Sequence, residues 1–294
     1  MTAPPIILHD RPPEHPAGLC LAVLADNTAR PGFRPEHGLS LCIMPPGGGL
    51  WLWDTGQGGL FLENARRLGI DPARARGVAL SHGHYDHAGG LENLLRLPGF
   101  SGEVVAHPAF AIPHYRRAAS AFACDIGCRC PPHLLKGRLR VVHAPARIDS
   151  GLYILPAIPR RQGNRQATGG MFLDPGGEWP DIIPDDACLV HRQGERLTVI
   201  LGCCHSGIAN TLDAVRDHFG DGVIDLVLGG LHLSGEGRRT ILEASDALSG
   251  HGVRALCPGH CTGKAATALL RQQFPGPVLP LAAGMVMEVK EDTP

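Results

Sequence analysis

The chain has 294 residues, of which 44% are hydrophobic and 19% are charged, a composition typical of a globular protein with a sizeable buried core. Its 27 Lys and Arg residues nearly balance its 28 Asp and Glu residues. The chain as a whole therefore has no electrostatic attraction to nucleic acid or to anionic membranes, and only a local basic patch would provide one.

The N-terminal segment 1–18 contains prolines, acidic residues and histidines, where a signal peptide needs a basic start and a continuous apolar stretch. No apolar run approaches the roughly 18 to 20 residues of a membrane helix. We therefore expect a soluble, cytoplasmic protein without a membrane partner. The ten cysteines are then expected to be reduced thiols rather than a disulfide framework.

The first half of the chain alternates apolar runs with amphipathic segments, which predicts alternating strands and helices. The predicted elements are strands 18–26, 39–44 and 49–56, helix 60–70, strand 77–82, helix 89–97 and strand 102–107.

The second half has a similar rhythm. Its predicted elements are strands 186–192 and 196–202, a helix capped by Ser206, strand 222–230, helix 240–250, strand 253–257 and helix 263–274. Both halves place histidines where a strand ends and a helix begins, which is where open α/β sheets usually form ligand sites. Residues 108–184 are irregular and rich in proline and glycine. We expect a cap over the site there, within one domain that spans 1–294.

The segment SHGHYDHAGG (81–90) holds the densest group of potential metal ligands. His82 and His84 alternate, so in extended backbone their side chains lie on one side of the chain. Asp86 and His87 follow as the chain turns toward a helix, and they can point at a second position. Such an arrangement favours two divalent cations, as in two-metal hydrolytic sites. Nitrogen and carboxylate ligands suit zinc, iron or manganese.

This segment resembles the His-x-His-x-Asp-His signature of the metallo-β-lactamase superfamily, whose fold is an αββα sandwich. WDTG (53–56) resembles the strand end that precedes the signature, which implies that Asp54 supports the ligand loop. Four further segments resemble the branch named after the dihydropterin–ribofuranosylaminobenzene phosphate synthase of methanopterin biosynthesis. They are LADNT (24–28), ILGCCHSGIANTL (200–212), LVLGGLHL (226–233) and CPGHCTGKAA (257–266). The resemblance extends from about residue 20 to residue 289.

The resemblance also implies the remaining ligands. His260 corresponds to the last histidine of the superfamily, which binds with Asp86 and His87, and His205 is the best candidate to join His82 and His84. The superfamily normally has a bridging aspartate after the strand that we predict at 196–202, but Cys203 lies near that place here. Either Cys203 bridges the two metals, or His205 acts without a bridging residue.

Other polar residues have weaker assignments. His232 follows an apolar strand and is expected to bind substrate or transfer a proton, with a packed histidine as the alternative. His143 is expected to be an ordinary strand histidine. Surface positions are predicted for the following histidines: His9, His15, His37, His133, His218 and His251.

The sequence also contains a candidate anion site and a group of cysteines. Backbone amides near Ser206 and Asn210 could hold a phosphate or carboxylate of the substrate, together with Arg160 and Arg161 from the cap. The cysteines of CDIGCRC, which are Cys124, Cys128 and Cys130, could bind an extra zinc or react with oxidants, but idle thiols are favoured. Cys257 and Cys261 flank His260 and are expected to tune its surroundings without binding metal themselves.

The leading prediction is therefore a metal-dependent hydrolase that uses a metal-bound hydroxide on a small-molecule substrate, with Asp86 orienting the water. One alternative is a pterin-linked synthase or transferase of one-carbon metabolism, as the branch name implies. Another is a metal or thiol redox sensor without turnover. No nucleic-acid partner is expected, because no strongly basic stretch is present. The sequence does not predict the oligomeric state.

Overall fold

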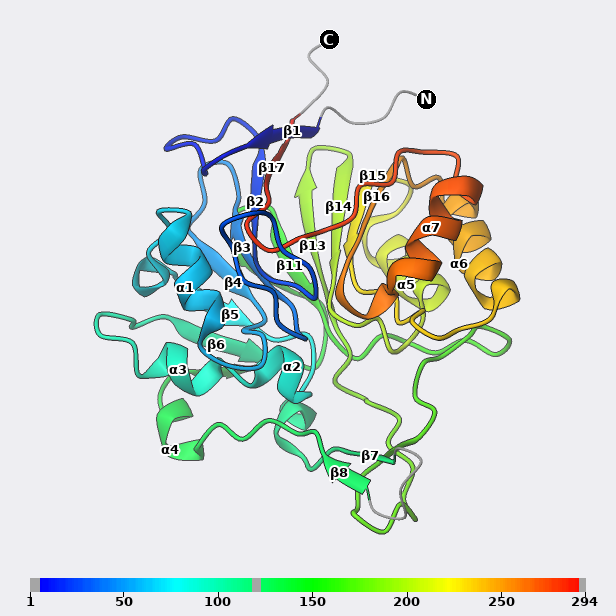
Figure 1. The fold of residues 1–294 in the computed structure, drawn as a ribbon, viewed down its shortest axis with the longest axis horizontal. Coiled ribbons are helices and arrows are strands. Elements are labelled where there is room, and N and C mark those ends of the chain that lie inside the picture. Colours follow the sequence, from blue (N-terminus) through cyan, green and yellow to red (C-terminus); the bar gives the residue numbers. More distant parts are fainter. Residues whose placement is uncertain (1–5, 118–122, 291–294) are drawn as a thin grey trace.

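Two mixed β-sheets lie face to face in the computed structural model, and helices cover their outer faces (Figure 1). The structure describes residues 6–117 and 123–290. The predictions for residues 1–5 of the N-terminal segment, and for 118–122 in the expected cap, lie outside the described residues. Within these ranges, none of the helices has the length and apolar character needed to span a bilayer.

The first sheet has eight strands. Neighbouring strands from β1 to β4 in the order below are antiparallel, and those from β4 to β9 are parallel. In spatial order they are β1 (Ile6–His9), β17 (Val286–Val289), β2 (Leu19–Ala25), β3 (Ser40–Met44), β4 (Trp51–Trp53), β5 (Gly77–Ala79), β6 (Glu103–Ala106) and β9 (Leu139–Val141). Its outer face packs against α1 (Leu60–Arg67) and α3 (Leu91–Leu95) through a shared cluster of buried side chains.

The second sheet has six strands, of which the last three run parallel. They are β10 (Ala146–Asp149), β11 (Leu152–Leu155), β13 (Cys188–Gln193), β14 (Arg196–Leu201), β15 (Val223–Gly229) and β16 (Ala255–Pro258). Its outer face carries α5 (Ile208–Phe219), α6 (Arg238–Gly250) and α7 (Lys264–Gln273). The predicted αββα sandwich is therefore confirmed.

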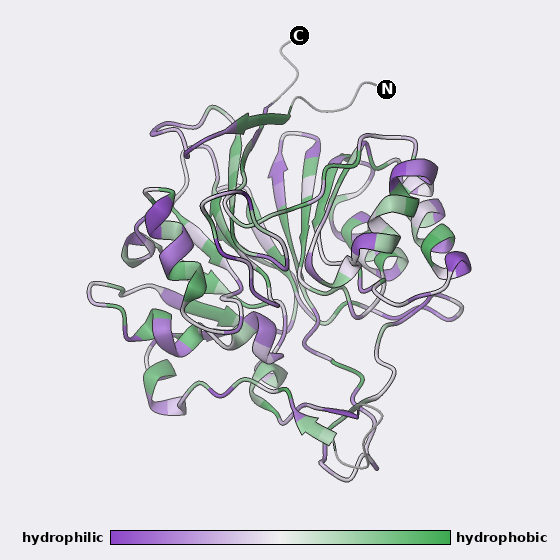
Figure 2. Cartoon of the chain, in the orientation of Figure 1, coloured by the Kyte–Doolittle hydropathy of each residue, from purple (hydrophilic) through white to green (hydrophobic). Residues whose placement is uncertain are grey.

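The inner faces of the two sheets share the central core. Leu21 and Leu41 of the first sheet belong to the same buried cluster as Leu189 and Leu226 of the second. Figure 2 shows the corresponding apolar colour along the strands and more hydrophilic residues on the helices. Trp53 also joins the sheets, because its buried indole N–H donates to the carbonyl of Leu201 at 3.0 Å. All ten cysteines are free thiols.

The range 108–184 is not uniformly irregular, as its composition predicted. β9, β10 and β11 fall inside it and belong to the two main sheets. Only the third, three-stranded sheet stands apart, with β12 (Met171–Phe172), β7 (Tyr115–Arg117) and β8 (Ala123–Asp125) at the lower edge of Figure 1. Strands of three or four residues show too little alternation to be recognised from sequence. The cap stays a prediction, restricted to the segments around this small sheet.

Several predicted elements differ in extent, and two of them have a clear local cause. The predicted strand 49–56 ends at Trp53, because Asp54 adopts a left-handed backbone with φ of 58°. The predicted helix 89–97 is shortened to α3, and the pair Gly89 and Gly90 separates it from a preceding short helix, α2 (Tyr85–Ala88). Both glycines pack against backbone carbonyls of the 55–58 loop too closely for a β-carbon.

Asp149, at the end of β10, ties the second sheet to the first. One oxygen of its carboxylate accepts the backbone N–H of Gly49 at 3.0 Å and the indole N–H of Trp51 at 2.7 Å. The other oxygen pairs with the guanidinium of Arg76 at 3.0 Å. Burial alone would raise the pKa of Asp149, but these hydrogen bonds, that of the Ser150 N–H and the charge of Arg76 lower it below its usual value.

We expect Asp149→Ala to lower the free energy of unfolding by about 1–3 kcal/mol, because it leaves the buried Trp51 and the backbone of Gly49 without a charged acceptor. Since the folded pKa is lowered, this stabilisation is present above the unfolded pKa of about 3.9 and is lost as the pH falls through the folded value. Urea unfolding at pH 7 and at a series of pH values below 4 measures the free energy of unfolding of variant and wild type. The difference between these two free energies should become smaller as the pH falls. Asp246→Ala, at an exposed position of α6, is the control. A difference that widens at low pH would contradict this assignment.

Candidate metal centre

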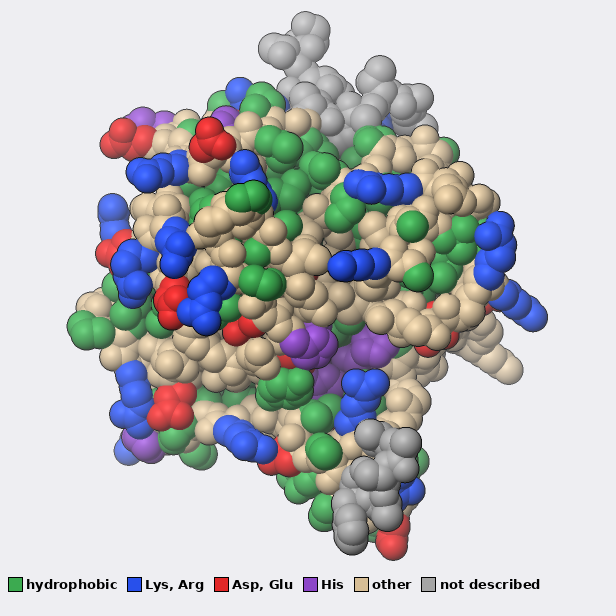
Figure 3. Space-filling model, viewed as in Figure 1, with side chains coloured by type: hydrophobic (Ala, Val, Ile, Leu, Met, Phe, Trp, Pro, Cys, Tyr) green, Lys and Arg blue, Asp and Glu red, His purple; other side chains and the backbone are tan. Residues whose placement is uncertain are grey.

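The candidate site lies where strands of both sheets end on one edge of the sandwich. Asp54 follows β4, the 81–88 loop follows β5, and His205 follows β14. His232 and His260 follow β15 and β16 in the same way. Because the carboxyl ends of parallel strands meet at one edge, these side chains converge from distant parts of the sequence. Figure 3 shows the histidines gathered in a hollow, with Lys and Arg side chains around it.

The 81–88 loop turns sharply at Gly83. A β-carbon there would lie 2.1 Å from the carbonyl oxygen of Phe110, so only glycine fits. The turn brings the Nε2 atom of His82 to 3.0 Å from the Nδ1 atom of His84. His84 caps α2, and its extended backbone starts the helical turn that carries Asp86 and His87.

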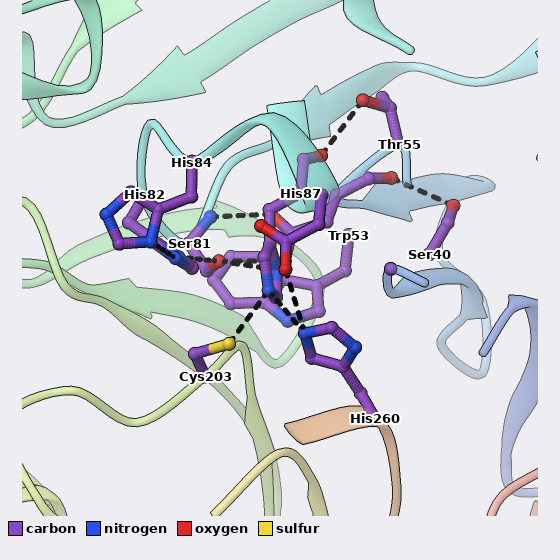
Figure 4. Close-up of polar contacts among 12 residues, drawn as sticks. Ser40, Trp53, Thr55, Ser81, His82, His84, His87, Cys203 and His260 are labelled. Atoms are coloured by element: carbon purple, nitrogen blue, oxygen red, sulfur yellow. Dashed lines mark hydrogen bonds and ion pairs between the residues drawn. The ribbon is translucent and has the colours of Figure 1, made fainter. Parts of the chain in front are cut away.

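Asp54 fixes the orientation of His87. Its carboxylate accepts the backbone N–H and the hydroxyl of Ser81, each at 2.8 Å, and lies 2.7 Å from the Nδ1 atom of His87. A carboxylate only accepts, so the Nδ1 atom carries the proton and the Nε2 atom presents its lone pair. Figure 4 shows the result: the Nε2 atom of His87 points at Cys203 and His260, at 3.0 and 3.2 Å.

His82, His84 and His205 form the first group of rings. The ring of His205 lies 4.8 Å from that of His82 and 4.9 Å from that of His84, centroid to centroid. Its Nδ1–H donates to the carbonyl of Ala167 at 2.7 Å, and its buried Nε2 atom has no hydrogen-bond partner among the described residues. Burial lowers the pKa of all three histidines, that of His84 to about 3. At neutral pH these imidazoles are uncharged and offer lone pairs.

Asp86, His87 and His260 form the second group. The Nδ1–H of His260 donates to the side-chain oxygen of Asn27 at 2.8 Å, which turns its Nε2 atom toward Asp86 at 3.3 Å. Burial alone would lower the pKa of His260, but the contact with Asp86 raises it to about 9. Burial alone would likewise raise the pKa of Asp86, but hydrogen bonds from His260 and His37 hold it well below its usual value.

Both groups fit a divalent cation. In the first, buried imidazole nitrogens at His84 and His205 have no partner among the described residues, which is unusual for buried polar atoms. In the second, the Nε2 atoms of His87 and His260 lie 3.2 Å apart beside the carboxylate of Asp86, and a cation bound there would displace protons from these ligands. Nitrogen, oxygen and sulfur donors together match the ligands of zinc.

Cys203 lies between the two groups. Its sulfur lies within 4.8 Å of ligand atoms of His82 and His205. It also lies within 4.8 Å of ligand atoms of His87 and His260. The thiol is fully buried, and it occupies the central position where the resemblance implies a bridging aspartate.

Comparisons with known proteins identify the family of this chain. The model of the Metallo-beta-lactamase superfamily matches residues 39–126. The solved structure of Tm1679, a metal-dependent hydrolase of the beta-lactamase superfamily, is 31% identical, with a TM-score of 0.79, over 93% of this chain and 100% of that chain. The chain belongs to the metallo-β-lactamase superfamily.

Two curated proteins of Methanocaldococcus jannaschii are similar to this chain over most of its length. One is the 7,8-dihydropterin-6-methyl-4-(beta-D-ribofuranosyl)-aminobenzene-5'-phosphate synthase, which is 27% identical over 87% of this chain and 91% of its own. The other is an uncharacterized protein that is 29% identical over 86% of this chain and 94% of its own.

A cavity of about 450 Å³ opens beside the two groups. The first group reaches it through His84 and His205, and the second through Asp86 and His260. His232 also lines it, with its ring centroid 4.5 Å from that of His205 and its buried Nδ1 atom without a partner among the described residues. The opposite wall comes from the small sheet and its flanks, through the following residues: Arg116, Arg117, Cys124, Ile126 and Met171.

The residues predicted to hold an anion do not line this cavity. The guanidinium of Arg161 pairs with Asp217 at 2.6 Å and Asp213 at 3.3 Å, on the outer side of α5. That of Arg160 donates to the carbonyl of Ile183. Both guanidinium groups therefore bind other parts of the chain, outside the cavity. The expectation that they contact substrate in the cavity is corrected.

The start of α5 is also covered. Asn210 is fully buried, and its side-chain oxygen accepts the backbone N–H of Arg161 at 2.9 Å. Ser206 is buried as well, and its backbone N–H donates a hydrogen bond to the carboxylate of Asp186 at 2.7 Å. A β-carbon at Gly207 would lie 1.9 Å from the carbonyl oxygen of Arg165, so that segment lies directly over the helix start. The predicted anion site at these amides is therefore occupied by the chain itself.

Sequence reasoning missed two histidines of the centre. His37 was expected to be a surface residue, and it is half-exposed, but its Nε2 atom lies 3.2 Å from the carboxylate of Asp86. His114 is fully buried, with its ring 5.1 Å from that of His84 and its Nδ1 atom 2.6 Å from the carboxylate of Asp181. No sequence signal links His114 to Asp181, because they lie 67 residues apart in the irregular range.

The remaining assignments are simpler. His143 follows β9 and packs against the ring of His107 at 5.5 Å between centroids, so it does not join the cavity. Cys124 lines the cavity, but neither it nor Cys128 nor Cys130 belongs to any group of potential metal ligands in residues 6–117 and 123–290. An extra zinc at these cysteines therefore has no support.

We expect Asp54→Asn to weaken zinc binding by about 10–100-fold, because His87 loses the carboxylate that fixes its tautomer and orientation. Competition with a chromophoric chelator measures the affinity, and Asp246→Asn, on the exposed face of α6, is the matched control. Unchanged zinc affinity in Asp54→Asn, with normal affinity in the control, would remove Asp54 from this role.

Proposed function

We propose that this chain is a metal-dependent hydrolase with two divalent cations, and that its substrate is a small molecule with an anionic group. The observation that carries the proposal is the convergence of two groups of buried ligands on one open cavity. The first would hold one cation through His82, His84 and His205. The second would hold the other through Asp86, His87 and His260, with Cys203 between them. Tm1679, which is a metal-dependent hydrolase, supports the same reaction class.

Divalent cations at such positions lower the pKa of water and polarise the bond to be hydrolysed. The chain's own groups would orient the reactants. Asp86 remains a carboxylate at neutral pH, since His260 and His37 lower its pKa, so it can accept a hydrogen bond from water. His232, beside His205 at the cavity wall, is placed to give a proton to the leaving group.

Zinc is the ion that suits this donor set best. Imidazole, carboxylate and thiol are its usual protein ligands, and a thiol at the centre disfavours magnesium and manganese, which prefer oxygen. Iron, which also accepts imidazole and carboxylate, is the second choice.

The anionic part of the substrate would meet Arg116 and Arg117. Both come from β7 and border the cavity opposite the histidines. The guanidinium of Arg117 is already engaged with the carbonyl of Gly176 and lies 5.1 Å from the ring centroid of Phe172. Arg116 is exposed and is therefore the better candidate to pair with a phosphate or carboxylate.

A pterin-linked synthase is the second candidate function. It is supported by the curated relative whose name specifies a dihydropterin product that carries a 5'-phosphate. Turnover of chromogenic phosphodiesters and esters would favour the hydrolase. Saturable binding of a reduced pterin, without turnover of those compounds, would favour the synthase.

We expect protein purified without chelators to contain about two zinc ions per chain, and expect His84→Ala and His205→Ala to lose metal and phosphodiesterase activity together. Elemental analysis and a chromogenic phosphodiester assay measure the two quantities. His133→Ala, at an exposed position in the chain, is the control. Wild-type metal content in both site variants would refute the assignment of these ligands.

We expect Arg116→Ala to raise KM for a phosphate-bearing ester about tenfold, equivalent to about 1.4 kcal/mol, and to leave KM for a neutral ester unchanged. Arg129→Ala is the control, since Arg129 is exposed and pairs with Asp125 outside the cavity. Equal changes for both esters would show that Arg116 does not recognise the anion.

A further inference from the structure

Cys203 and His232, which the proposed hydrolytic centre also uses, lie beside Cys261, which it does not use, and the three form a cluster of their own. Cys203 follows β14, His232 follows β15, and Cys261 lies in the 3-10 turn His260–Thr262 that follows β16. One potential ligand atom of each lies within 4.8 Å of those of the other two. All three residues line the 450 Å³ cavity.

The backbone around this cluster is strained. His232 has φ of 48° and His260, next to Cys261, has φ of 46°, both in the left-handed region that residues other than glycine rarely adopt. At Gly230 a β-carbon would lie 2.5 Å from the sulfur of Cys261, so the close approach of this sulfur requires glycine. Strain of this kind persists where the surrounding structure maintains it, and it is concentrated at functional sites.

The polar atoms of the cluster are only partly satisfied. The backbone N–H of His232 donates to the sulfur of Cys261 at 3.2 Å, a contact that favours the thiolate form of a cysteine ligand. The thiol of Cys261 itself donates to the carbonyl of Cys203, at the long distance of 3.7 Å. The Nδ1 atom of His232 is buried and has no partner among the described residues. The imidazole nitrogen of His232 and the sulfurs of Cys203 and Cys261 are thus close enough to bind one cation.

We propose that Cys203, His232 and Cys261 form a further cation position, selective for soft or borderline ions such as Zn²⁺ and Cd²⁺, that shares Cys203 with the imidazole groups. Two thiolates and one imidazole are a known zinc ligand set that leaves a fourth position open, here toward the cavity. Binding of the cation releases the protons of both thiols to solvent. The position does not depend on hydrolysis, so it extends beyond the proposed function.

Cobalt substitution tests the proposal, because cobalt–thiolate bonds give a charge-transfer absorption in the near ultraviolet that histidine and carboxylate ligands do not. Metal-free protein is titrated with Co²⁺, and wild type is expected to show this band. Cys261→Ser should lose about half of its intensity, since one of two sulfur ligands is removed. Cys261→Ala serves as a second variant, and circular dichroism checks that both variants are folded.

Cys257→Ser is the matched control. Cys257 lies four residues before Cys261, in β16, and its buried sulfur belongs to none of the ligand groups in the part of the chain that the structure describes. The control should keep the full band. An unchanged band in folded Cys261→Ser and Cys261→Ala, or no band in wild type, would overturn the proposal.

His84→Ala separates this proposal from the hydrolase. We expect that variant to bind less Co²⁺ in total, because the first imidazole group is disrupted, but to keep most of the thiolate band. A wild-type protein that binds Co²⁺ without any thiolate band would refute the thiolate position, but it would leave the imidazole and carboxylate ligands of the proposed hydrolase intact. A strong thiolate band in a protein whose metal content does not respond to His84→Ala would refute the hydrolytic ligand set and leave the thiolate position standing.

Discussion

Asp54 leaves β4 in a left-handed conformation, and its buried carboxylate accepts hydrogen bonds from the backbone and hydroxyl of Ser81 and holds the ring of His87. An ionised group with no exposure is costly to bury unless each oxygen is paired, and here both oxygens are. The same contacts fix the 81–88 loop against β4 and direct the Nε2 atom of His87 toward Cys203 and His260. The two sheets therefore meet at the candidate centre through one carboxylate and the ring that it orients.

The sandwich fold supports this arrangement of buried polar residues. Its central core is built from the inner faces of both sheets, and it places the ends of β5, β14, β15 and β16 on one edge without any ligand having to cross the core. Neighbouring buried imidazoles with unpartnered nitrogens would otherwise destabilise the fold, since buried polar atoms without partners cost about 1–3 kcal/mol each. Metal binding would offset that cost, and this links stability of the centre to its proposed function.

Much of the fold was accessible from the sequence, because the long apolar strands and the helices α5, α6 and α7 have clear periodicity. The SHGHYDHAGG segment likewise identified four candidate ligands, since its spacing is local. The structure adds what depends on tertiary contacts: His37 reaches Asp86 across a loop, and His114 packs against His84 from the range predicted to be irregular. Arg160 and Arg161 were basic residues near the right helix, but acidic partners on that helix, which sequence proximity does not identify, hold Arg161 away from the cavity.

Two cations are proposed to bind where the strands of both sheets end. The most direct test is anomalous diffraction at the zinc edge from a crystal of the zinc-loaded protein. We expect one peak among His82, His84 and His205 and a second among Asp86, His87 and His260. Zinc found only at surface histidines, with the buried rings still in contact with one another, would contradict it.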